Sequence, residues 1–367
     1  MIKYLGSKRR LVPQILALVR GFPQAHTVLD LFSGTSRVGH ALKREGYRVL
    51  ANDHNAYAQV LARCYVQADA DLLGEAARLI RELDALPGRP GWFTETYCER
   101  SRFLHPRNGE RVDSIRQGIA ELGLPPDLEA IALVSLMEAA DRVDSTTGVQ
   151  MAYLKEWAPR AHQPLRLRVP ELLPRAPHGA GEAHGLDALE AAARLPADVA
   201  YIDPPYNQHS YLGNYHVWET LVRWDRPDVY GVACKRGDCR VRRSALNSRP
   251  RFRATLERIL QAVRAPVLVV SFSDEGFLAR DEMEALLAAR GALSVYEHDS
   301  RRYVGAQIGI YNPRGEKVGQ PGRLRNTELL YVVAPESMAS GPPRTHPAAT
   351  ERLAAGFGVG LAAGRDP

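Results

Sequence analysis

Cysteine is scarce in this chain: its 367 residues include only four, at positions 64, 98, 234 and 239. That is too few for a disulfide scaffold, so a reducing compartment and a cytoplasmic location are expected. Cys234 and Cys239 could supply two zinc ligands, but no second Cys or His pair stands nearby at zinc-finger spacing, and we predict no metal site. The chain also lacks an uninterrupted apolar run of about 18 residues, so no membrane-spanning helix is expected.

Acidic charge is in the minority. The chain has 48 Lys and Arg against 42 Asp and Glu, a formal net charge of +6 at pH 7. This balance favours a polyanionic partner such as a nucleic acid without requiring one. Hydrophobic residues make up 45% and charged residues 25%, which is typical of a folded protein with a sizeable core, and the length suggests two or three domains.

Strand and helix patterns alternate near the start of the chain and again in its second half. An apolar strand pattern at 28–32 is followed by a small-residue loop, a helix pattern that ends at Gly46, and a second strand pattern at 48–53. Later strand patterns cover 199–202, 267–272, 293–298 and 329–333, with a helix at about 280–290. This alternation predicts an α/β fold with a parallel sheet.

A long helical stretch interrupts that pattern. Helical periodicity runs through segments near 56–68, 70–86, 110–122 and 127–142, and five prolines between 159 and 177 predict an extended linker. We therefore expect four regions: 1–70 and 181–335 as two parts of one α/β domain, 71–180 as a helical insertion with its linker, and 336–367 as a tail. The Ala, Gly and Pro content of the tail predicts disorder.

The loop after the first strand reads Asp30-Leu-Phe-Ser-Gly34. It has neither the Gly-x-Gly-x-x-Gly fingerprint nor the lysine of a P-loop, which discourages a nicotinamide dehydrogenase. Gly34 permits a sharp turn and a close ligand approach. Asp30 would repel a pyrophosphate but suits a cationic group such as a sulfonium, and Asp53, at the end of the next strand, can bind both hydroxyls of a ribose. An ordinary strand-turn-helix with an exposed acid remains the alternative.

A second pattern, Asp203-Pro204-Pro205-Tyr206, follows the strand at 199–202. Two successive prolines fix a rigid turn that cannot extend the strand. The Asp203 carboxylate and the Pro204 carbonyl are then adjacent acceptors, which match the two N–H donors of an exocyclic amine, and Tyr206 supplies a flat face on which a base can stack. A simple Pro-Pro turn closed by an acid is the alternative interpretation.

Taken together, these motifs resemble the DNA N6-adenine methyltransferases of the Dam-like (D12) class. Asp203-Pro-Pro-Tyr206 downstream of Phe32-Ser-Gly34 carries the resemblance, and further matches are Lys3–Arg9, Ala51–Asn55 and Asn326–Leu330. The motif order is that of the family's alpha arrangement, and the similarity covers about residues 1–335. One departure is Ser36, which stands where the family's cofactor loop commonly has a second glycine.

The resemblance implies a Rossmann-like methyltransferase sheet and an enzyme that moves a methyl group from S-adenosylmethionine to N6 of a flipped-out adenine. The implied catalytic residues are Asp203, Pro204, Pro205 and Tyr206. The implied cofactor-binding residues are Tyr4, Lys8, Asp30, Phe32, Ser33, Gly34, Asp53 and Asp187. For Asp187, an ordinary exposed acid at a helix start is an equally open interpretation, and for Lys8 a solvated lysine in a basic run.

Basic residues concentrate after the Asp-Pro-Pro-Tyr turn. The segment 223–264 has twelve basic and four acidic residues, and aromatic residues precede it between 207 and 218. This combination suits phosphate contacts and base stacking, so we expect double-stranded DNA as the partner. The predicted DNA-binding residues are Asn207, Tyr211, Tyr215, Lys235, Arg236, Arg242, Arg243 and, from a second basic cluster around a predicted hairpin, Arg302. A merely soluble charged surface is the alternative.

Other activities stay open at this point. The same chemistry could act on cytosine N4 or on an RNA base, although Ser commonly replaces the motif's Asp in cytosine-N4 enzymes, so Asp203 favours adenine. A non-catalytic DNA-binding protein on the same fold is another alternative. A cognate restriction endonuclease that acts separately would be compatible with the sequence, which reveals neither a recognition site nor an oligomeric state.

Overall fold

The computed structural model describes residues 1–301, 310–311, 317–319 and 325–338, and confirms the α/β class. Its main sheet has seven strands in the order β3-β2-β1-β4-β7-β11-β8. Their bounds are β1 Thr27–Asp30, β2 Arg48–Asn52, β3 Glu182–His184, β4 Val199–Ile202, β7 Val267–Ser273, β8 Ala292–Arg301 and β11 Arg325–Ala334. Two small antiparallel pairs lie outside it: β5 Val229–Tyr230 with β6 Lys235–Arg236, and β9 Ile310–Tyr311 with β10 Lys317–Gly319.

The expected parallel sheet is mixed at one edge. The pairs β3-β2, β2-β1, β1-β4 and β4-β7 are parallel, whereas β11 runs antiparallel to both β7 and β8. An apolar run predicts a buried strand but not its direction, so the sequence pattern at 329–333 located this strand and left its orientation open. The short strand β3 was missed because three residues give no clear pattern.

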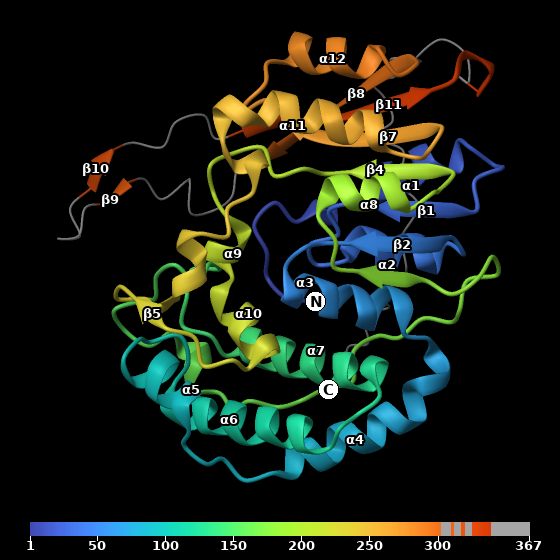
Figure 1. Cartoon of the computed structure of the whole chain (residues 1–367). Coiled ribbons are helices and arrows are strands. Elements are labelled where there is room, and N and C mark those ends of the chain that lie inside the picture. Colours follow the sequence, from blue (N-terminus) through green and yellow to red (C-terminus); the bar gives the residue numbers. More distant parts are fainter. Residues whose placement is uncertain (302–309, 312–316, 320–324, 339–367) are drawn as a thin grey trace, which may run out of the picture.

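Helices cover both faces of the sheet and also form a separate body (Figure 1). Their bounds are α1 Val12–Arg20, α2 Arg37–Arg44, α3 Ala56–Ala62, α4 Leu73–Ala85, α5 Trp92–Thr94, α6 Pro106–Glu121, α7 Pro126–Arg142, α8 Ala188–Arg194, α9 Tyr211–Asn214, α10 His216–Arg223, α11 Arg249–Ala262 and α12 Arg280–Ala288. Helices α1 and α2 share one apolar core with the sheet, and α8, α11 and α12 share the other. The sequence analysis did not predict α1, α8, α10 or α11.

The stretch predicted as a helical insertion contains several helices, gathered in the lower half of Figure 1. Its core joins α4, α6 and α7 to α3 and to α10, which lies far downstream in the sequence. The proline-rich segment 159–177 was expected to be extended, but it begins with the 3-10 helix Pro159–His162. It is also packed: Leu165 and Leu167 are buried, and the Leu165 N–H donates to Asn108 Oδ1 at 3.0 Å. The segment therefore packs as part of the insertion.

Two predicted regions reach the limit of what the structure describes. The tail expected to be disordered begins with a short 3-10 helix at Glu336–Met338, and residues 339–367 lie outside the described residues. Within the described ranges, no helix is long and apolar enough to cross a membrane, and no group of three or more His, Cys, Asp or Glu residues is placed to hold a metal ion.

Candidate active site

A cavity of about 560 Å³ opens at the carboxyl ends of β1, β2 and β4. Open α/β sheets bind ligands at this edge. The connections that leave two neighbouring strands here run to opposite sides of the sheet, and a crevice opens between them. Its wall is built from four stretches that are distant in the sequence: the segment 4–8, the loop 30–38, the residues 53–55 and the turn at Asp203. The segment 242–247 closes the opposite side. The volume lies in the usual range of small-molecule sites.

The loop after β1 is locked to the end of β2. The Gly34 N–H donates to Asp53 Oδ2 at 3.1 Å, while Asp53 Oδ1 accepts from the backbone N–H and the side-chain Nδ2 of Asn55, each at 3.0 Å. Gly34 has a φ of +50°, a left-handed conformation that favours glycine. Phe32 and Ser33 also line the cavity. The loop predicted to hold a cofactor is therefore held rigidly against the acid predicted to bind a ribose.

Asp30 is a buried carboxylate with one open oxygen. It is 1% exposed, its Oδ2 accepts from the Gly39 N–H at 3.1 Å, and its Oδ1 has no hydrogen-bond partner among the described residues. Burial, together with the negative charge of Asp203, raises the pKa of Asp30 to about 7. A cationic ligand group in this cavity would stabilise the ionised form, so the site fits a sulfonium or an ammonium.

Ser36 adopts a conformation that glycine would adopt more easily. Its φ is +57° and its ψ is 22°, in the left-handed region, and it precedes the first residue of α2. This is the position where the related cofactor loop commonly has glycine. We therefore expect Ser36→Gly to raise the free energy of unfolding by about 1 kcal/mol, because a non-glycine residue is strained there. Calorimetry should show a melting temperature higher by about 1–2 °C, and an unchanged or lower one would contradict the argument.

The Asp203 carboxylate shares one lysine with a second acid. Lys8 Nζ lies 3.2 Å from Asp203 Oδ1 and 3.2 Å from Glu328 Oε2. The pKa of Asp203 is raised to about 6. Burial is the largest cause, the charge of Lys8 opposes it, and the charge of Glu328 adds to it. Burial lowers the pKa of Lys8, but Asp203, Tyr206 and Glu328 outweigh this and raise the pKa well above its usual value. Lys8 therefore stays charged, and its proximity to the cavity agrees with the prediction that it lies at the site.

The two prolines of the turn have different surroundings. Pro205 lines the cavity and Pro204 is buried, with no hydrogen bond to its carbonyl among the described residues. Tyr206 packs its ring edge against Phe272, with ring centroids 5.4 Å apart, and lies under Lys8 Nζ at 5.7 Å from the ring centroid. Tyr206 is not among the residues that line the cavity. Its predicted role as a stacking platform therefore stays a prediction.

A stack of tyrosines forms another part of the wall. Tyr4 lies between Tyr211, with ring centroids 5.1 Å apart, and Tyr215, with ring centroids 4.5 Å apart, and both pairs are nearly parallel. Tyr4 and Tyr211 line the cavity. Tyr215 is 1% exposed and its hydroxyl accepts a 2.6 Å hydrogen bond from the Leu5 N–H. The ring of Tyr215 is buried in the interior, which does not favour a contact with DNA, and its DNA-binding role stays a prediction.

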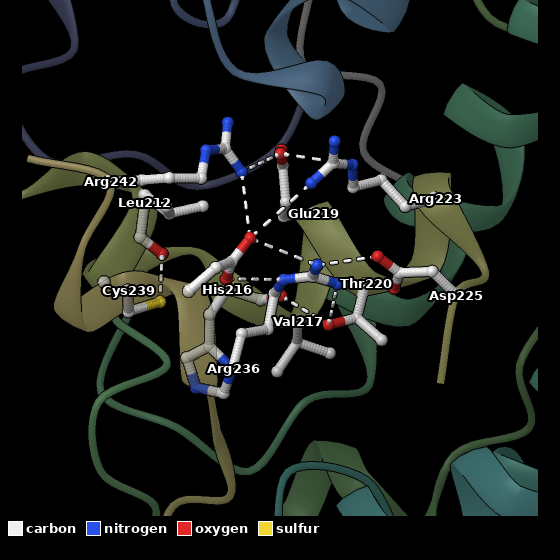
Figure 2. A network of polar contacts seen from close by, with 12 residues as sticks. Leu212, His216, Val217, Glu219, Thr220, Arg223, Asp225, Arg236, Cys239 and Arg242 are labelled. Carbon is white, nitrogen blue, oxygen red and sulfur yellow. Dashed lines mark hydrogen bonds and ion pairs between the residues drawn. The ribbon is translucent and has the colours of Figure 1, made fainter. Parts of the chain in front are cut away.

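Several arginines of the basic segment are neutralised internally (Figure 2). Arg236 is 2% exposed and pairs with both carboxylate oxygens of Asp225 at 2.7 Å, and also with Asp238. Its guanidinium is buried and occupied, which does not favour a contact with DNA, so the DNA-binding role of Arg236 stays a prediction. Arg242 donates to the fully buried Glu219 at 2.8 Å, yet it also lines the cavity.

Glu219 joins this network to the cofactor side of the cavity. Its Oε1 accepts from Arg242, and its Oε2 accepts from the backbone N–H of Tyr57 at 3.2 Å, in the first turn of α3. That turn follows Asp53 and Asn55 directly. One buried carboxylate therefore connects the helix that follows the acidic motif with the basic segment that follows the Asp-Pro-Pro-Tyr turn.

The remaining predicted residues fall into three groups. Asp187 caps α8, since its Oδ1 accepts from the Leu189 N–H at 2.9 Å, and it also lines the cavity, so its cofactor-binding role stays a prediction. Arg243 lines the cavity, Lys235 lines an adjoining hollow near α9 and the start of α11, and Asn207 lines neither, although its carbonyl accepts from Asn247 Nδ2 at 2.8 Å. Arg302 lies outside the described residues.

Sequence reasoning missed Glu328 and Glu219 as members of the site. Glu328 belongs to a segment that the resemblance did mark, Asn326–Leu330, but nothing in that segment indicates that its acid meets Lys8. Glu219 looks like an ordinary helix acid in the sequence. A signal for it does exist, since a charged residue within the apolar pattern of α10 (Val217, Trp218, Leu221) indicates a buried partner.

Comparisons with known proteins agree with this geometry. A family model of the D12 class N6 adenine-specific DNA methyltransferases matches residues 4–250. The Type II methyltransferase M.NlaIII of Neisseria lactamica is 28% identical over 314 residues, covering 82% of this chain and 92% of the relative. The Type II methyltransferase M.FokI of Planomicrobium okeanokoites is 28% identical over 325 residues, covering 82% of this chain and 50% of the relative, so the chain spans about half of its length.

Among solved structures, the methyltransferase domain of bacterial-CtHen1-C aligns with 88% of this chain and 96% of its own, at a TM-score of 0.30 and 10% identity. That similarity is too distant to support a conclusion. The family match, by contrast, covers well over half of the chain and includes both the cofactor-type loop and the Asp203 turn. The chain belongs to the D12 class of N6 adenine-specific DNA methyltransferases.

Proposed function

We propose that this chain transfers a methyl group from S-adenosylmethionine to N6 of an adenine that is flipped out of double-stranded DNA. One observation carries the proposal: the Asp203 turn faces the same cavity as Asp30, Gly34 and Asp53. An acceptor for an amine and a binding site for a cationic nucleoside thus share one space. Membership of the D12 class supports adenine as the target.

The cofactor side of the cavity suits S-adenosylmethionine, which supplies the transferable methyl group when bound. Asp53 would accept hydrogen bonds from the ribose hydroxyls, and its own bonds to Gly34 and Asn55 hold it in place for this. Asp30 would face the positive charge, since its open Oδ1 has no other partner in the described part of the chain. Asp187, at the edge of the cavity, would accept from an adenine amine.

On the substrate side, this chain's residues orient and activate the target amine. The N6 amine of adenine is a weak nucleophile because its lone pair is conjugated with the ring. Hydrogen bonds from its two N–H groups to Asp203 and to the Pro204 carbonyl would favour tetrahedral nitrogen and localise that lone pair. The rigid proline turn keeps both acceptors fixed, so positioning and electrostatics provide the acceleration.

The same carboxylate can take up the proton that the reaction releases. After transfer, the methylated N6 nitrogen carries one proton too many, and an N–H bond must break as the proton moves to an acceptor. Asp203 is the acceptor in contact with that amine, and its pKa of about 6 lets it return the proton to water near neutral pH. Lys8 and Glu328 lie directly behind it and hold the carboxylate in place.

A labelling experiment tests the function as a whole. The purified chain is incubated with unmethylated genomic DNA and S-adenosylmethionine with a labelled methyl group, and the DNA is then digested to nucleosides and separated by mass. We expect label in N6-methyldeoxyadenosine. Label in N4-methyldeoxycytidine, label transferred only to RNA, or no label at all would each contradict the proposal.

The pH profile of the reaction follows from the site. Asp203 must be ionised to accept from the amine, and because its pKa in the free protein is raised to about 6, we expect kcat/KM to be constant above that pH and to fall below it. Glu328→Gln removes the neighbouring negative charge and leaves Lys8 to Asp203 alone, so the pKa of Asp203 should fall. In the Glu328→Gln variant, the fall in rate at acidic pH should therefore occur at a lower pH than in the wild type. The same pH in both proteins would contradict the shared-lysine arrangement.

The partners also follow from the family. The relatives M.FokI and M.NlaIII are named as Type II methyltransferases, so we propose that this chain acts within a restriction-modification system, beside a separate endonuclease of the same specificity. Base-sequence recognition is proposed for the helical insertion, which α10 joins to the active-site wall.

A further inference from the structure

A second cavity, of about 490 Å³, borders the catalytic one. Ser210, Arg243, Ser244 and Asn247 line both. The second cavity lies between the loop that follows Tyr206, the short helix α9, strand β6 and the start of α11. It is therefore next to the space where Asp203 would meet its target, on the side away from the cofactor loop.

The charge of this second cavity is entirely positive. Lys235, Arg243 and Arg251 line it, and no Asp or Glu does. Within the part of the chain that the structure describes, none of these three has an ion pair. The arginines of Figure 2 behave differently, since Arg236 and Arg242 are neutralised by buried or half-buried acids. The basic segment is thus sorted into internally paired charges and unpaired charges, and three of the unpaired ones surround this cavity.

Uncharged donors complete the lining. Asn214 is 3% exposed and its side-chain amide makes no hydrogen bond to any described residue, although it borders the cavity. The amide therefore remains free to donate a hydrogen bond to a ligand in the cavity. Ser248, the N-cap of α11, also lines the cavity and makes no side-chain capping bond, so its hydroxyl is free to contact a ligand.

We propose that this second cavity binds a phosphate of the DNA strand that carries the target base, next to the flipped nucleotide. This inference rests on the proposed function. A nucleotide that flips rotates about its own backbone, so the phosphates beside it must lie at the mouth of the catalytic cavity. Three unpaired cations, an unpartnered amide and a serine hydroxyl are groups that bind a phosphate. Contacts of this kind hold the strand while the base is out of the stack.

Arg251 and Arg253 provide a matched pair of variants on one helix. Arg251 lines the cavity, whereas Arg253 pairs with Glu282 at 3.0 Å and does not line it. We expect Arg251→Ala to weaken binding to a fluorescently labelled DNA duplex roughly five- to tenfold and to lower the slope of log K against log salt by about 1, as the loss of one phosphate contact does. Arg253→Ala should change neither value. Binding of S-adenosylmethionine should be unaffected in both.

The outcomes separate this inference from the proposed function. If Arg251 contacts a phosphate, Arg251→Ala must weaken binding by the same factor for a duplex that contains the sequence methylated by the wild type and for a duplex that lacks it. If only the duplex with the site is affected, Arg251 reads a base and the phosphate proposal is wrong. It is equally wrong if Arg251→Ala binds DNA like the wild type while the wild type methylates DNA normally. The binding titration needs no methyl transfer, so a chain that binds DNA through Arg251 but transfers no methyl group would contradict the proposed function alone.

Discussion

Replacing Asp203 by alanine should lower kcat for methyl transfer by about 10²–10³-fold, as the removal of one preorganised group from a reacting centre does in other enzymes. The variant loses the acceptor that localises the lone pair of the target amine. Cofactor affinity should stay within about threefold of the wild type, because no cofactor contact is assigned to this carboxylate. Single-turnover transfer of labelled methyl groups at saturating DNA and cofactor measures the first quantity, and calorimetric titration measures the second.

The fold should tolerate this change. Lys8 loses one partner but keeps Glu328, which also lies 3.2 Å from its Nζ. Asp203→Asn should retain more activity than Asp203→Ala, since the amide oxygen still accepts one hydrogen bond. Asp187→Ala, at another carboxylate of the same cavity, serves as the matched control and should affect cofactor binding rather than kcat. Near wild-type transfer by Asp203→Ala would remove the central role of this residue.

Replacing Asp53 by alanine should weaken S-adenosylmethionine binding roughly 30-fold, or about 2 kcal/mol, because charge-assisted hydrogen bonds to the ribose would be lost. The Gly34 N–H and both donors of Asn55 would also lose their acceptor, so the loop would become less rigid. Asp53→Asn should cost less, since its Oδ1 can still accept. Equilibrium titration of the cofactor is the direct measurement.

A control for this second prediction is available on the neighbouring helix. Glu190 is exposed on α8, pairs with Arg194 on the same helix and does not line the cavity, so Glu190→Ala should leave the affinity unchanged. At saturating cofactor, Asp53→Ala should regain most of its rate, because Asp53 is assigned to binding and not to the transfer step. A variant with unchanged affinity, or one whose rate is lost even at saturation, would contradict the ribose role.

The core of the site could be predicted because its residues belong to local patterns. Asp30, Gly34 and Asp53 stand at strand ends, and Asp203 begins a proline turn at the end of another strand. The carboxyl ends of parallel strands meet at one edge of a sheet, so these patterns were sufficient to bring the residues together. All four of these residues line the cavity.

What could not be predicted depends on contacts between distant segments. Twelve basic residues were counted in 223–264, but the count does not show that Arg236 is buried between Asp225 and Asp238. Tyr215 looks like a stacking residue in the sequence, yet its ring is covered by Tyr4 in the structure. Arg251 differs from Arg236, Arg242 and Arg253 because they are paired with acids, whereas it has no ion pair among the described residues and lines the second cavity.

The pairing of Lys8 with Glu328 has a consequence for how the protein is made. The two residues are 320 positions apart, so Lys8 emerges from the ribosome long before Glu328 has been synthesised. Until β11 is added between β7 and β8, the lysine has no Glu328 and the sheet lacks an interior strand. Methylation competence should therefore appear only after β11 has emerged from the ribosome, so that a nascent product that stops before β11 would leave DNA unmodified.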